Sequence, residues 1–137
     1  MILPMAALVL LTFIVAFTML AARIRAVKSR EVSLSYFKTY DASPRELPER
    51  MVLTQRCFNN LLEIPPLFYV ACLAAMVIGM SGLLMLTLAW TYVALRAVQA
   101  FIHLNGNNVI WRMRSFLLGN LVLLAMWAIL VVAQLGV

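Results

Sequence analysis

Three long stretches without a charged residue constrain this chain more than any other feature of its sequence. They span residues 1–22, 64–95 and 115–137. About 20 apolar helical residues cross a hydrocarbon core of roughly 30 Å, so the first and last stretches each match one crossing. The middle stretch would run about 48 Å as a single helix, and its Gly-Met-Ser-Gly segment at 79–82 predicts a turn. The sequence therefore predicts four membrane-spanning helices.

The composition agrees with a chain that lies in a membrane. Of the 137 residues, 65% are hydrophobic and 12% are charged, whereas water-soluble domains have about 25% charged and roughly 45–50% apolar residues. A soluble enzyme is excluded, because so apolar a chain cannot cover its own surface, and a disordered chain would be far more polar. We predict an all-α integral membrane protein, a four-helix bundle formed by a single domain, residues 1–137. Its expected helices lie at about 1–23, 48–79, 83–105 and 113–136, with a loop at about 24–47.

Lysine and arginine gather in two of the segments that join the predicted helices. Eight lie in residues 23–56 and two, Arg112 and Arg114, follow the third helix, whereas the chain ends and segment 79–82 have none. Four crossings place both basic segments on one side of the membrane. Because cytoplasmic loops are rich in positive charge, we expect the basic side to be cytoplasmic and both termini to be extracytoplasmic.

The loop after the first helix contains a basic tract, from Arg23 to Lys38, in which Tyr36 and Phe37 lie close to the charges. Clusters of positive charge beside a membrane span attract anionic lipid. Nucleic-acid binding is a weaker interpretation, because the charges are few and face a membrane. We therefore expect the tract to contact the lipid bilayer and no nucleic acid.

Proline marks the start of the second helix and a break within it. The steps Ser43-Pro44 and Leu47-Pro48, together with Glu46, are helix-start signals, and we place the start near Pro48. Further along, Pro65-Pro66 removes two backbone donors and is expected to kink the helix.

The two cysteines, Cys57 and Cys72, are 15 residues apart. This spacing fits no Cys or His metal motif, and a disulfide scaffold needs more cysteines in a more polar chain. We expect two buried thiols and no metal site.

Two ionisable residues lie deep within the predicted spans. Glu63 is seven residues past Arg56, about 10 Å along the second helix, and Arg96 is ten residues before Gly106, about 15 Å along the third. Their similar depths would allow a buried ion pair. An isolated charge would cost several kcal/mol there, and pairing with additional hydrogen bonds is the usual remedy.

Further polar residues share a helix face with Glu63 or with Arg96, at spacings of three, four, seven and eleven positions. On the second helix, Arg56 and Asn60 share the face of Glu63. On the third helix, the residues that share the face of Arg96 are Gln99, His103 and Asn107, and on the fourth helix Asn120 lies near the same level. We therefore expect a one-sided polar site in the cytoplasmic half of the membrane.

Each of these residues has two interpretations. Glu63 and Arg96 either join the second helix to the third through polar contacts or bind a ligand, and both roles can hold at once. For His103, a buried histidine with satisfied hydrogen bonds is favoured over a catalytic one. Arg112 and Arg114 are either loop charges that meet lipid phosphate or residues of the site.

Residues 56–68 read RCFNNLLEIPPLF. The string resembles the signature of the MAPEG family, the membrane-associated proteins in eicosanoid and glutathione metabolism. That signature runs Arg-x-x-x-Asn-x-x-Glu-x-x-Pro and continues with an apolar residue and Phe. Arg96 matches the family's third-helix Arg, and Arg112 stands where several members place an Arg that faces the glutathione thiol. Length, helix number and the long first loop also agree, and the run 96–119 is most similar to bacterial members.

The resemblance implies a homotrimer in a bacterial inner membrane. Glutathione, as co-substrate, would lie between subunits near the cytoplasmic face, and lipophilic small molecules would arrive from the bilayer. Arginines offer bidentate donors to the two glutathione carboxylates, and an Arg beside the thiol would favour the thiolate. The implied glutathione-binding residues are Arg56, Asn60, Glu63, Arg96 and Gln99, and the implied catalytic residues are Arg112 and His103.

Two positions depart from the catalytic members of the family. His103 stands where they usually have Tyr, and Phe58 where prostaglandin-type members have His. One hypothesis is a glutathione-dependent transferase or peroxidase acting on lipophilic electrophiles or hydroperoxides. The alternative is a catalytically inactive membrane protein of the same fold, whose polar cluster serves helix packing. The sequence leaves both open, and also whether Arg112 or Arg114 faces the site.

A small multidrug exporter is a third class of membrane protein with which the sequence can be compared. Such exporters also have four helices, but their membrane Glu lies in the first helix and is left unpaired to exchange protons. Here the predicted first span has no ionisable residue, so the exporter does not fit.

Overall fold

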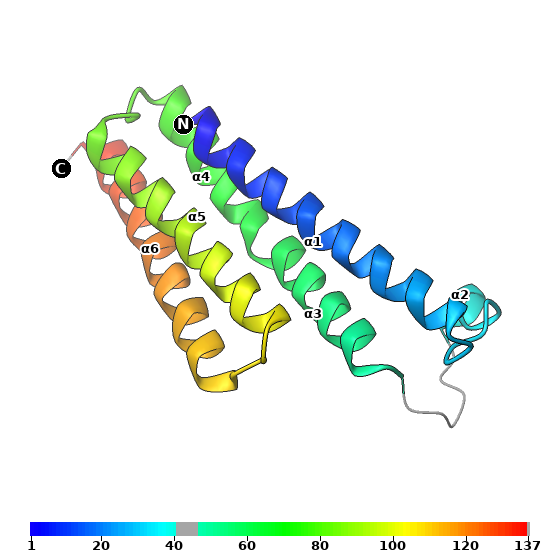
Figure 1. The fold of residues 1–137 in the computed structure, drawn as a ribbon. Coiled ribbons are helices and arrows are strands. Elements are labelled where there is room, and N and C mark those ends of the chain that lie inside the picture. Colours follow the sequence, from blue (N-terminus) through cyan, green and yellow to red (C-terminus); the bar gives the residue numbers. More distant parts are fainter. Residues whose placement is uncertain (41–46, 137) are drawn as a thin grey trace.

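Four long helical segments lie side by side in the computed structural model (Figure 1), which describes residues 1–40 and 47–136. Within these residues, each of the four is long and apolar enough to cross a membrane. They are α1 (Ile2–Lys28), the pair α3 (Glu49–Glu63) and α4 (Pro65–Val77), α5 (Leu83–Leu104) and α6 (Val109–Leu135). A short helix, α2 (Tyr36–Thr39), follows α1. The prediction of an all-helical membrane bundle is confirmed.

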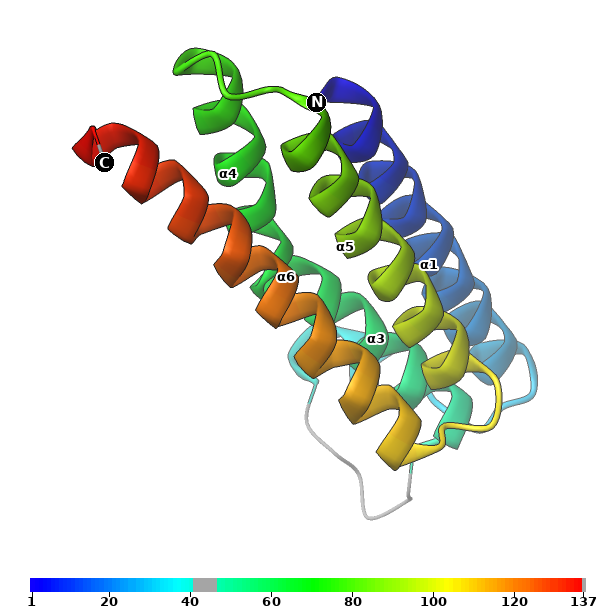
Figure 2. The ribbon, with the colours of Figure 1, turned by 90° about the vertical axis from the view of Figure 1, so that its left-hand side faces the viewer.

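The two ends of the bundle differ in what they carry. The start of α1, the turn between α4 and α5 and the end of α6 lie together at one end (Figures 1 and 2). The α1–α2 connection and the turn between α5 and α6 lie at the other, which is where the predicted basic segments fall. The helices therefore alternate in direction, as four crossings require.

The second span is broken at Ile64, between α3 and α4. Pro65 and Pro66 follow, at the first positions of α4. Neither has a backbone N–H, so the carbonyls of Leu61 and Leu62 lack the donors that a continuous helix would provide. The predicted kink is confirmed, and it falls directly after Glu63.

Two helix bounds differ from the predicted ones. The first helix continues to Lys28 rather than about 23, because Ala26 packs with Val32 and Met51 in a second apolar cluster beyond the main core. The last helix begins at Val109 rather than about 113, because the Asn108 side chain caps it by accepting from the Trp111 N–H at 3.2 Å. The helix-start signals Ser43-Pro44 and Glu46 lie outside the described residues, and Glu49 begins α3 as expected near Pro48.

The core is packed with small and aromatic side chains. Ala71, Ala75 and Ala89 are fully buried, and such small residues let membrane helices approach closely. Phe68 of α4 stacks on Tyr92 of α5, with ring centroids 4.6 Å apart. Tyr92 lies one helical turn before Arg96 on α5, so this aromatic stack is adjacent to the polar cluster around Arg96. Cys57 and Cys72 are buried free thiols, as expected.

Candidate functional site

Arg96 is the centre of a buried polar network. Its side chain is 1% exposed. One terminal nitrogen donates to Gln99 Oε1 at 2.9 Å and the other to Asn120 Oδ1 at 2.7 Å. Gln99 Nε2 in turn donates to Asn60 Oδ1 at 3.3 Å. The network thus joins α5 to α6 and to α3, through amide oxygens that carry no charge.

Aromatic rings complete the surroundings of the guanidinium. Its carbon lies 5.0 Å from the ring centroid of Tyr92 and 5.1 Å from that of Phe116, within the range of a cation–π attraction. Gly119 packs against the same group: a Cβ placed there would lie 3.8 Å from Arg96 Nε. The arginine is therefore fixed on two sides by rings and at its tip by amides.

Glu63 does not join this network. The depths of the two side chains would allow an ion pair, but Glu63 is exposed on the surface of the chain while Arg96 is buried. Within the described residues the bonds of Arg96 go to Gln99 and Asn120, and no salt bridge links it to a carboxylate. The ion pair allowed by the sequence is absent within one chain.

The direction of the polar face on α3 explains this difference. Arg56, Asn60 and Glu63 do share one side of the helix, as their spacing predicts. The buried side of α3 is instead formed by Cys57 and Leu61, 2% and 5% exposed, and it lies about a third of a turn away around the helix. Arg56 and Glu63 are consequently exposed, and only Asn60, which is partly buried, reaches Gln99.

A second cluster lies closer to the polar end of the bundle. His103 is 3% exposed, and its Nε2 has no hydrogen-bond partner in the described structure. The charges of Arg56 and Arg112 both act on His103, and that of Arg112 also acts on Cys57. Arg56 comes from α3 and Arg112 from the first turn of α6, so two spans bring cationic side chains close to a histidine of a third span, α5.

The structure distinguishes the two arginines of α6. Arg112 is partly buried and donates to Asn107 Oδ1, on the turn that precedes the helix. Arg114 is exposed and lies over the ring of Trp111, with 5.1 Å between its guanidinium carbon and the ring centroid. Arg112 therefore faces the cluster around His103, and Arg114 lies on the outer surface.

Three buried polar atoms in the described structure have no hydrogen-bond partner. They are the Tyr92 hydroxyl, Arg96 Nε and His103 Nε2, and all three side chains lie on the inward face of α5. Unpaired buried polar atoms are rare in folded proteins and each calls for an explanation, such as a bound water or ligand. Each of these three atoms on the inward face of α5 could therefore form a further hydrogen bond.

Sequence reasoning found most of this network and missed two of its members. Phe116 has no sequence signal, since one aromatic residue in an apolar span looks like any other. Tyr92 lies one turn before Arg96, a spacing that places two side chains together, and that signal could have been used. Among the described residues, no group of three or more His, Cys, Asp or Glu side chains forms a metal site.

The sequence matches the model of a known protein family. The family model described as MAPEG family matches residues 1–132. No curated protein and no solved structure is similar to this chain at the level required for a match. The family match covers nearly the whole sequence, and it agrees with the four apolar helices and with the signature in residues 56–68. This chain is an integral membrane protein that belongs to the MAPEG family.

Proposed function

We propose that this protein binds glutathione and transfers it to lipophilic electrophiles, or uses it to reduce lipophilic hydroperoxides. One observation carries the proposal: Arg96 is 1% exposed and is held by neutral amide oxygens. A buried positive charge without a carboxylate partner is costly. An anion bound nearby would lower this cost, and glutathione supplies two carboxylates.

The other cations of the site support an anionic ligand. Arg56 and Arg112 both lie near His103 at the polar end of the bundle. Arginine binds carboxylate through two parallel N–H···O bonds, so two such groups suit a peptide with a carboxylate at each end. Glu63, exposed on the adjoining face, is the matching partner for the glutathione ammonium.

The outward direction of Glu63 supports an assembly of several chains. A charged side chain at the centre of a membrane helix costs about 2.5–3.5 kcal/mol on insertion scales, and such residues normally face protein or water rather than lipid. A neighbouring subunit would cover the face formed by Arg56 and Glu63. We therefore place glutathione between subunits of a homotrimer, at the polar end, which faces the cytoplasm of a bacterial cell.

Arg112 is the group best placed to act on sulfur. It lies at the start of α6, partly buried and held by Asn107. A guanidinium beside the thiol stabilises the thiolate, which is the attacking form. In conjugation with an aryl halide, the sulfur forms a bond to the ring carbon, the halide leaves with the bonding electron pair, and the thiol proton passes to solvent.

Titration of the purified, detergent-solubilised protein with glutathione tests this proposal. Wild type should bind saturably, and Arg112→Ala should weaken binding by about ten- to a hundredfold, because a charge-assisted hydrogen bond is worth about 1.5–3 kcal/mol. Arg114→Ala, which removes an exposed arginine from the same helix, is the matched control and should leave the affinity unchanged. Arg96→Ala should abolish binding, provided that its melting temperature shows a folded protein.

A catalytically inactive protein of the same fold is the second candidate, and one observation favours it. Both terminal nitrogens of Arg96 already have partners inside the chain, so the network can serve to join α5, α6 and α3. This candidate predicts no saturable glutathione binding by wild type. A conjugation assay with an aryl halide, on wild type and His103→Tyr, then distinguishes binding from catalysis. Conjugation by the wild-type protein would exclude the second candidate, a catalytically inactive protein.

A further inference from the structure

A surface groove of about 450 Å³ lies where α1 ends and the chain turns toward α2. Its floor is apolar. Leu20, Ile24 and Val27 line it from one side of α1, and Leu34 lines it from the connecting segment. Leu34 is 73% exposed and Leu20 is 50% exposed, so the groove is open to whatever surrounds the protein.

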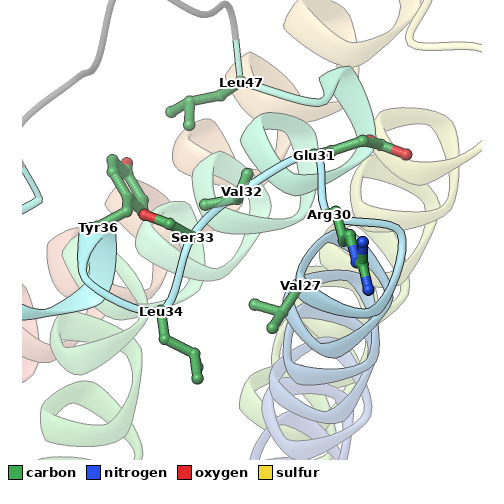
Figure 3. Close-up of a pocket in the computed structure, with 8 residues that line it drawn as sticks. All are labelled: Val27, Arg30, Glu31, Val32, Ser33, Leu34, Tyr36 and Leu47. Carbon is green, nitrogen blue, oxygen red and sulfur yellow. The ribbon is translucent and has the colours of Figure 1, made fainter.

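The connecting segment forms a second wall opposite α1. In Figure 3 the side chains of Val27 and Leu34 point toward one another across the gap between helix and loop. A neighbouring cavity of about 460 Å³ shares both residues and continues toward Tyr36 and Leu47. An extended apolar ligand would therefore find contacts on both sides.

Positive charge and aromatic rings gather at the mouth of the groove. Lys28, at the end of α1, is exposed and lines it. Arg23 lines it as well, with its guanidinium carbon 5.8 Å from the ring centroid of Phe37 and 6.0 Å from that of Tyr40. Arg23 also donates to Gln55 Oε1, which uses part of a fork that has five N–H donors. Among the residues that the structure describes, those lining the groove include no carboxylate.

The groove has the dimensions and position of a lipid site. From Leu20 to Lys28 it follows α1 for about 12 Å, at 1.5 Å per residue. Over that length the lining changes from leucine to lysine, at the end of a membrane span. Tyr and Trp rings and basic residues are typical of the level of lipid headgroups. Positive charge there attracts anionic headgroups in particular.

We propose that this groove binds one anionic phospholipid. One of its acyl chains lies on Leu20, Ile24 and Leu34, and its phosphate is held by Arg23 and Lys28. The site is separate from the cluster around Arg96 and does not depend on the proposed reaction. It gives the basic tract at the end of α1 a defined ligand, rather than a diffuse attraction to the membrane surface.

Lipid retention measures the proposal directly. The delipidated full chain in detergent is given equal amounts of phosphatidylglycerol and phosphatidylcholine with the same acyl chains, and bound lipid is counted by native mass spectrometry. Wild type should retain phosphatidylglycerol at least fivefold better. Lys28→Gln should reduce this preference about fivefold, the effect of one basic residue near an anionic surface, and Leu34→Glu should abolish it.

Arg25→Gln is the matched control, because Arg25 is exposed on the same helix and does not line this groove. It should keep the wild-type preference. Arg23→Gln also loses the hydrogen bond to Gln55, so the melting temperature of this variant is measured as well. The variants at Lys28 and Leu34 change exposed side chains, so they test the proposal without this complication. Equal retention of the two lipids, or an equal loss in Arg25→Gln, would overturn the proposal. So would cross-linking of Lys28→Cys to a second copy, since the groove would then be a subunit contact.

Discussion

Arg96 shows how a charged residue is accommodated inside an apolar bundle. Each terminal nitrogen has an amide acceptor, and two rings lie against the guanidinium. The acceptors come from different helices, so the side chain serves as a joint between α5 and α6. The buried charge of Arg96 is stabilised by uncharged partners alone, so the loss of any one partner should destabilise the folded protein.

Asn120→Leu tests this dependence. The variant leaves one guanidinium nitrogen buried without an acceptor, which should lower the free energy of unfolding by about 1–3 kcal/mol. Gln134→Leu makes a similar change at an exposed position near the other end of α6 and should have little effect. Unfolding in mixed detergent micelles, followed by circular dichroism, gives both values. Equal stability of the two variants would mean that the bond from Arg96 to Asn120 contributes nothing.

At the level of single residues, the sequence predicted roughly how deep the polar side chains lie in the membrane. It did not predict their hydrogen-bond partners. Asn120 was expected near the level of Arg96, and it is bonded to it, whereas Glu63 was expected at the same level and is exposed. Depth follows from counting along a helix, but partnership depends on how each helix is rotated about its axis.

The rotation of membrane helices is hard to predict because lipid and protein core are both apolar. In water, the apolar side of α3 would identify the buried face. In a membrane span the outward side is apolar as well, and α4 places Leu67 and Val70 outward while Ala71 and Ala75 are buried. Side-chain size is the better indicator here, since small residues mark the face that packs.

The start of α6 was also hard to predict from the sequence. The charges of Arg112 and Arg114 indicated a loop there, but the helix begins earlier, because the Asn108 side chain caps it. Asn108→Ala should lower the free energy of unfolding by about 0.5–2 kcal/mol, the usual effect of losing an N-cap acceptor. Asn108→Ser, which keeps an acceptor, should restore most of the loss. Thermal unfolding of wild type and both variants measures it, and an unchanged Asn108→Ala protein would exclude the cap as the start of α6.

The whole molecule repeats a simple pattern that the sequence predicted well. Four crossings follow from the uncharged stretches and the basic segments, and both views of the fold agree with them (Figures 1 and 2). The number of subunits is beyond such reasoning, because an interface between membrane proteins uses the same residues as a lipid-facing surface. The proposal of an assembly rests instead on the exposed carboxylate of Glu63.

The proposed trimer has a direct test. Native mass spectrometry of the detergent-solubilised protein should show three chains, and Glu63→Ala should lower the share of that species, because a carboxylate facing another subunit contributes contacts to it. Gln134→Ala, an exposed polar position in another span, should leave the share unchanged. A wild-type protein that appears only as single chains would exclude the trimer.

The break at Ile64 has a consequence for what this chain requires from its surroundings. Two backbone oxygens without their usual helical donors and an outward carboxylate occur together within four residues, 61–64, in the middle of the second span. All of them accept hydrogen bonds, and hydrocarbon tails have none to give. A second copy of the chain, or a small cationic group, that covered this segment would therefore have to supply hydrogen-bond donors to it.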